Sequence, residues 1–174
     1  MGSDTVYAAQ PPMKDQETDR YIVRSRRDPG SFTALIAIYQ TRIYSFLARM
    51  VGVQAAEDLF QEVWIQVYKA SAKYNPQGKA TSWIFKIAHK TARRYYQDLH
   101  AESAVGEGLE AGTTLRQAID GLPVQERTVF LLREYAGMPF KEIAETLDIP
   151  LETGLSLMNA AIDKLREKLE PYRA

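Results

Sequence analysis

Apolar residues recur every three or four positions along most of this chain, which is the period of amphipathic helices. One long helix is predicted from about Ser31, which can cap it, to about Val51 before Gly52. Its buried stripe would consist of Phe32, Leu35, Ile36, Tyr39, Ile43, Phe46, Leu47 and Met50. A short basic helix over residues 19–27 is expected before it, because an Asp-Pro-Gly stop follows at residues 28–30.

Six further helices are predicted after the long one. They cover about 55–70, 81–99, 114–120, 123–135, 139–147 and 151–169. The segment 73–79 reads as a loop from its Asn-Pro and Gly signals, and 101–114 as a flexible acidic linker. The last two helices, joined by a tight turn, have the outline of a helix-turn-helix.

The pattern therefore predicts an all-α fold of two small helical domains joined by a flexible linker, the second with a helix-turn-helix. No alternation typical of strands is present. The expected division is a tail over 1–18, a first domain over 19–100, the linker over 101–114 and a second domain over 115–174.

Composition narrows the function. The 174 residues are 45% hydrophobic and 25% charged, as in soluble globular proteins. The chain has no cysteine and two histidines, so we expect neither a thiol nor a metal site, and no cofactor. No nucleophile–base pair or phosphate loop indicates an enzyme. Without a membrane span or signal pattern, a cytoplasmic location is expected.

The net charge of zero hides an asymmetry. Residues 19–100 carry 13 Lys and Arg against 6 Asp and Glu, a net charge of +7. Within them, the segment 81–96 interleaves cations with aromatic residues, as proteins do that hold a nucleic-acid backbone and stack on unpaired bases. An ordinary amphipathic helix with a solvated basic face would show the same pattern.

Three stretches together resemble the extracytoplasmic-function (ECF) sigma factors, over nearly all of residues 19–172. Residues 56–64, AEDLFQEVW, are similar to the polymerase-binding helix of that family, and 82–88, SWIFKIA, to its promoter-melting helix. Residues 122–130, LPVQERTVF, followed by EIAETL at 142–147, match the opening of its second domain. The resemblance implies a non-catalytic specificity subunit of bacterial RNA polymerase.

The resemblance also implies two surfaces on the first domain. The proposed polymerase-docking patch, which would meet the clamp of the largest subunit, consists of Glu57, Asp58, Gln61 and Glu62. The alternative is that Glu57 and Asp58 only stabilise the beginning of their helix. The proposed surface for melting the −10 promoter element consists of Lys73, Tyr74, Asn75, Lys79, Lys86, His89, Lys90, Arg93 and Arg94. Trp83 is expected in the core rather than on this surface.

The second domain departs from the family pattern. Leu155, Leu157 and Ala160 stand where the family's recognition helix carries three cations, and residues 138–163 contain one cation against five acids, a net charge of −4. Weak or absent recognition of the −35 element is therefore expected. The face that would contact DNA or a partner consists of Glu152, Thr153, Leu155, Ser156, Leu157 and Asn159.

Two accounts of that helix stay open. Its apolar residues Leu151, Leu155, Met158, Ile162, Leu165 and Leu169 form a stripe that we expect to be buried, with Leu157 off it. Either the stripe packs inside its own domain and DNA binding has been lost, or the face binds another protein that brings the polymerase to DNA.

The expected partners are core RNA polymerase, through its clamp and the flap of its second-largest subunit, and promoter DNA. An anti-sigma factor and a DNA-bound activator or RNA-guided recruiting protein complete the set. The competing function is a non-initiating adaptor or decoy that binds polymerase without reading promoters. The cations and aromatic residues of 73–96 favour the sigma factor.

Overall fold

The computed structural model describes residues 13–102 and 114–172, and every regular element in these ranges is a helix. The first group comprises α1 (Asp15–Arg24), α2 (Pro29–Val51), α3 (Val53–Ala70), the short η1 (Ser71–Lys73) and α4 (Ala80–Glu102). The second comprises α5 (Thr114–Asp120), α6 (Val124–Glu134), α7 (Phe140–Leu147), α8 (Leu151–Leu169) and η2 (Glu170–Tyr172). The all-α prediction is confirmed, and most of the linker predicted at 101–114 lies outside the described residues.

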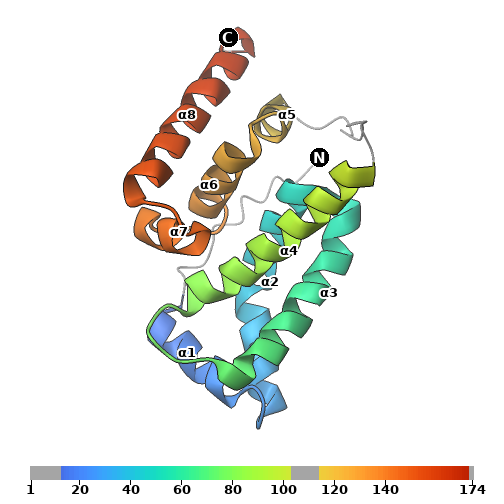
Figure 1. Cartoon of the computed structure of the whole chain (residues 1–174), viewed down its shortest axis with the longest axis vertical. Coiled ribbons are helices and arrows are strands. Elements are labelled where there is room, and N and C mark those ends of the chain that lie inside the picture. The colour runs from blue at the N-terminus through green and yellow to red at the C-terminus, as the bar shows by residue number, and fades with distance from the viewer. Residues whose placement is uncertain (1–12, 103–113, 173–174) are drawn as a thin grey trace, which may run out of the picture.

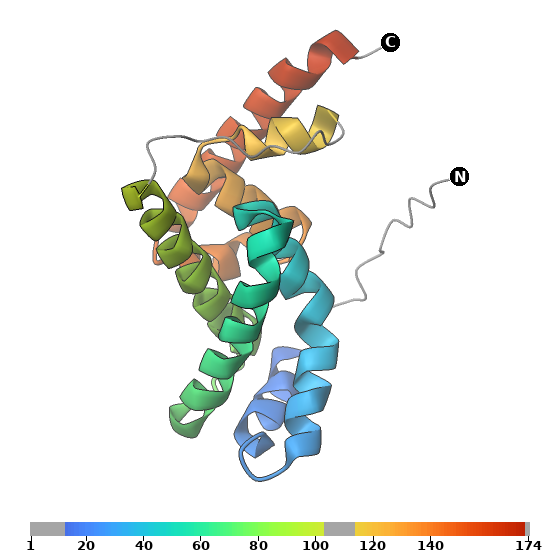
Figure 2. The same cartoon turned by 90° about the vertical axis from the view of Figure 1, so that its right-hand side faces the viewer.

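In the first domain α2, α3 and α4 pack along one another, and α1 lies against one end of them (Figures 1 and 2). The stripe predicted on α2 forms the centre, with Leu35, Tyr39 and Phe46 fully buried. Phe46 meets Phe85 of α4 edge to face, with ring centroids 5.9 Å apart. Aromatic pairs in this geometry add to the stability that burial provides.

Helix α1 begins at Asp15 rather than at Asp19, so the expected tail over 1–18 was wrong for its last residues. The Asp15 carboxylate accepts hydrogen bonds from the backbone N–H and the hydroxyl of Thr81, at 2.9 and 2.6 Å. It thereby satisfies a backbone donor at the beginning of α4. Asp19 is buried and accepts from the Gly78 N–H at 2.8 Å and from the Tyr74 hydroxyl. These two carboxylates fix the loop between α3 and α4.

Asp15→Ala should therefore lower the free energy of unfolding by about 0.5–2 kcal/mol, the range measured for lost helix caps. Urea denaturation followed by circular dichroism measures this change. Glu17→Ala is the matched control, because Glu17 is an exposed acid on the same helix. Equal stability of the two variants would contradict the role assigned to Asp15.

Helix α2 is capped by Asp28, not by Ser31 as expected. The Asp28 side chain accepts from the Gly30 N–H at 3.0 Å and from the Ser31 hydroxyl at 2.6 Å. Pro29 takes the first helical position, where its missing N–H costs nothing. Ser31 lies inside the helix and is buried.

In the second domain α8 packs on α5, α6 and α7, and α7 and α8 form the predicted helix-turn-helix. Asp148 ends α7 in the left-handed conformation, with φ of 54°, and Pro150 precedes α8. The stripe expected to be buried on α8 is only partly so. Met158 and Leu165 are buried, but Leu151, Leu155 and Ile162 are 46%, 40% and 36% exposed. Leu157, expected off the stripe, is half-buried against the core.

The two domains are in contact, with α7 lying against α4 and α6 against α2 (Figure 1). Arg42 of α2 is buried at this contact, and its Nε donates to the carbonyl oxygen of Ala136 at 2.9 Å. Among the described helices, none combines the length and apolarity that a membrane span requires.

Candidate functional site

The proposed polymerase-docking patch lies on α3 and is mostly exposed; it is called the acidic patch below. Glu57, Asp58 and Gln61 are exposed, whereas Glu62 is half-buried, accepts from Gln66 Nε2 at 2.9 Å and pairs with Arg94. Beneath them the apolar side of α3 is buried through Leu59, Val63 and Trp64. Because α3 begins at Val53, Glu57 and Asp58 lie beyond its first turn, where the helix dipole has little effect. Stabilisation of the helix end is therefore a poor explanation of these acids.

A row of cations runs along one face of α4 and the residue before it. The opposite face is buried through Phe85, Ala88 and Ala92. The spacing of the cations, in steps of seven, four and three, is the spacing that keeps side chains on one side of a helix. The cation row consists of Lys79, Lys86, Lys90 and Arg93, all exposed. Lys73 and Asn75 are exposed in the adjoining loop.

Three members of the predicted −10 surface have internal roles. Tyr74 is half-buried, donates its hydroxyl to Asp19 and packs against Trp83 with ring centroids 4.5 Å apart. Burial and the neighbouring Asp19 raise the pKa of Tyr74. Burial, assisted by Arg93, lowers the pKa of His89 to about 4, so that His89 is uncharged at neutral pH. Arg94 pairs with Glu62.

Two lysines of the cation row form ion pairs with acids of the second domain. Lys79 Nζ lies 3.0 Å from Glu145 Oε1, and Lys86 Nζ lies 2.8 Å from Asp148 Oδ1. Both acids belong to the negatively charged region 138–163, and the sequence did not predict that they contact the first domain. It also missed Arg42, although an arginine inside an otherwise apolar stripe, between Tyr39 and Phe46, signals a buried polar contact.

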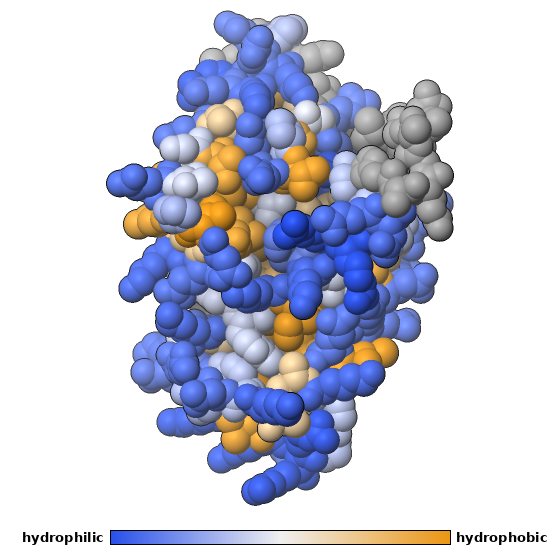
Figure 3. Space-filling view, viewed as in Figure 1, coloured by the Kyte–Doolittle hydropathy of each residue, from blue (hydrophilic) through white to orange (hydrophobic). Residues whose placement is uncertain are grey.

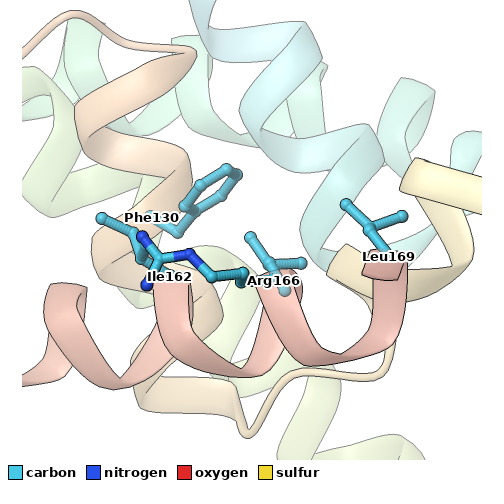
Figure 4. A pocket seen from close by; sticks show the side chains of 5 residues that line it. Phe130, Ile162, Arg166 and Leu169 are labelled. Carbon is cyan, nitrogen blue, oxygen red and sulfur yellow. The ribbon is translucent and has the colours of Figure 1, made fainter. Parts of the chain in front are cut away.

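The predicted face of the second domain occupies the first half of α8. Glu152, Thr153, Ser156 and Asn159 are exposed beside Leu155, whereas Leu157 is half-buried. A groove of about 300 Å³ lies further along α8, lined by Phe130, Ile162, Leu165, Arg166 and Leu169. Figure 4 shows the α8 side chains of this groove beside Phe130 of α6, and apolar side chains gather over this part of the surface in Figure 3. The first half of α8 thus exposes leucine and uncharged or acidic side chains rather than cations.

Two family models match the chain. The model of sigma-70 region 2 matches residues 35–101, and that of sigma-70 region 4 matches residues 113–153. The ECF RNA polymerase sigma-E factor of Haemophilus influenzae is 27% identical, with 91% of this chain and 99% of that protein covered. The RNA polymerase sigma-H factor of Pseudomonas aeruginosa is also 27% identical, over 91% and 97% of the two chains.

Solved structures show the same fold. CnrH, in complex with the cytosolic domain of CnrY, superposes with a TM-score of 0.73 at 17% identity, over 90% of this chain and 97% of that one. The sigma factor RpoE of Bartonella quintana, in complex with the anti-sigma factor NepR, gives a TM-score of 0.70 at 16% identity, over 80% and 96%. The family models match the first domain and the opening of the second, in the predicted order. The chain belongs to the ECF sigma factors, the non-catalytic specificity subunits that bind bacterial RNA polymerase.

Proposed function

We propose that this sigma factor opens the −10 element through its first domain and does not recognise the −35 element by itself. The observation that carries the proposal is the exposed cation row on α4 beside the loop that holds Lys73 and Asn75. Opening a duplex requires that the displaced strand be held, and a row of cations along a helix can follow its phosphates. Bases would enter beside Tyr74 and Trp83, whose rings adjoin that loop.

Docking is proposed at the acidic patch of α3, against the clamp of the largest polymerase subunit. The patch is exposed and lies on the α3 side of the domain, whereas the cation row lies on α4. Separate surfaces allow polymerase and DNA to be bound at the same time. The groove between α6 and α8 is proposed to receive the flap of the second-largest subunit, because it is open and mainly apolar.

The first half of α8 is proposed to bind a DNA-bound protein rather than the −35 element. Leu151 and Leu155 are exposed there beside Glu152, so that apolar contacts are available and a phosphate would be repelled. The exposure of these leucines favours a binding face over a helix whose stripe merely packs inside its domain. An activator or an RNA-guided protein would supply the position on DNA. A partner of the anti-sigma kind, as in the Bartonella quintana complex, is part of the proposal.

Footprinting of the native holoenzyme should show protection around the −10 element and none at −35. Introducing cations by Leu155→Lys and Asn159→Lys should produce upstream protection, which would be lost as salt rises, because each new phosphate contact releases a counterion. Both side chains are exposed on α8, where a lysine ammonium group can reach solvent or DNA.

The neutral variant with Leu155→Gln and Asn159→Gln is the control, and it should leave the upstream DNA unprotected. A −35 footprint made by the native holoenzyme alone would contradict the proposal. A holoenzyme that binds DNA but melts no promoter under any condition would favour the decoy instead.

A further inference from the structure

The helix-turn-helix contacts part of the proposed DNA-binding face of the first domain. Its acids Glu145 and Asp148 pair with Lys79 and Lys86, at 3.0 and 2.8 Å. Both lysines belong to the cation row that the proposed function assigns to the displaced strand. The carboxylates of the second domain therefore stand where DNA phosphates would stand.

The acids of α7 and its turn recur in steps of three and face the first domain. Glu142 precedes Glu145 and Asp148 and is half-buried at the same contact. Burial and the neighbouring Asp15 raise the pKa of Glu142, while the positive charge of Arg42 opposes that rise. Three of the five acids that give this region its negative charge thus lie close to cations of the first domain. The contact with these cations gives the acids of the helix-turn-helix a role within the protein, although the protein is proposed to bind DNA.

The contact also has a packed part, which gives it one defined geometry. The Arg42 guanidinium lies over the rings of Tyr39 and Phe85, 5.3 and 5.4 Å from their centroids, and donates to the Ala136 carbonyl. Ala136 and Met138, in the segment between α6 and α7, are fully buried. Because the buried Arg42 cation donates to a carbonyl oxygen of the other domain, it holds the two domains in one relative position.

We propose that this contact is an autoinhibitory latch, in which α7 occupies the cation row of the free protein as an internal substitute for DNA. The inference rests on the proposed function of that row. Release of α7 would free the ammonium groups of Lys79 and Lys86 from their carboxylate partners, so that they could bind phosphates together with Lys90 and Arg93. The two ion pairs are exposed, and such pairs shift an equilibrium by a factor of about five or less each. The latch is therefore reversible, and a partner that binds the open form better would release it.

The test weakens the latch without adding positive charge to the surface. Glu145→Gln and Asp148→Asn together remove both carboxylates, and asparagine tolerates the left-handed backbone at residue 148. The control variant, Glu134→Gln with Glu167→Gln, removes the same charge from exposed positions on α6 and α8, outside both the latch and the proposed partner face. Fluorescence anisotropy with a labelled mixed-sequence single-stranded DNA measures binding by the free full-length proteins. Small-angle X-ray scattering measures their radius of gyration.

The latch variant should bind the single-stranded DNA about three- to tenfold more tightly than the control variant, and its radius of gyration should be larger. Equal binding by the two variants would mean that net charge alone matters and would overturn the latch. An unchanged radius of gyration would overturn it as well. Tighter binding and expansion, with a wild-type holoenzyme that melts no promoter, would leave the latch standing and remove the proposed promoter function.

Discussion

Exchanging Glu57 and Asp58 for lysine is expected to abolish co-purification of the protein with core RNA polymerase. Both side chains are exposed on α3, so reversing them leaves the helix and its buried side intact. Like charges placed opposite each other in an interface cost several kcal/mol, so we expect an affinity loss of at least about 100-fold. Pull-down with tagged core polymerase measures it, and circular dichroism checks that the helical content is unchanged.

Glu62 is left out of this variant because it already pairs with Arg94 and Gln66. The matched control reverses Glu17 and Asp98, two exposed acids on α1 and α4. It changes the net charge by the same amount and should bind polymerase normally. Undiminished binding by the Glu57 and Asp58 variant would show that the polymerase clamp binds another surface of the protein.

The second large effect is expected on promoter opening. Alanine at Asn75, Lys90 and Arg93 should reduce the permanganate reactivity of thymines near −10 by at least about tenfold, since two phosphate contacts and one polar contact to the separated strand are lost. Polymerase affinity should stay unchanged, because these residues lie on α4 and in the loop before it, whereas the acidic patch lies on α3. Lys79 and Lys86 are excluded, because replacing them would also disturb their ion pairs with the second domain.

A control variant with alanine at Gln16, Arg27 and Lys69 removes the same kinds of exposed side chain from α1, α3 and the turn before α2. It should open promoters as the wild-type protein does. If the Asn75, Lys90 and Arg93 variant opened promoters equally well, the loop before α4 would be only a connector.

The sequence predicted the helices well wherever local pattern determines them. The predicted helix over 151–169 matches α8, and that over 139–147 differs from α7 by one residue, because proline and an apolar period mark their limits. The beginning of α1 was missed for a physical reason. Asp15 and Asp19 act on groups about 60 residues away, and a cap supplied from another helix leaves no local signal.

The site was predicted less completely than the fold. Helical spacing placed Lys90 and Arg93 correctly on an exposed face, but it could not show which cations meet acids from the other domain. The periodicity of α8 also predicted more burial than the structure shows. Of its apolar side chains, Met158, Ala161 and Leu165 are buried, because the second domain is small. Periodicity gives the direction in which a side chain points, whereas the size of the neighbouring domain decides whether anything covers it.

Permanganate and nuclease footprinting of one holoenzyme tests the central claim most directly. Core RNA polymerase and the wild-type protein would be assembled on a negatively supercoiled library, and transcript starts would be mapped on the same templates. Reactive thymines and a shared sequence near −10 are expected, without protection or a shared sequence at −35. A shared and protected −35 element, bound without any further protein, would contradict the proposed function.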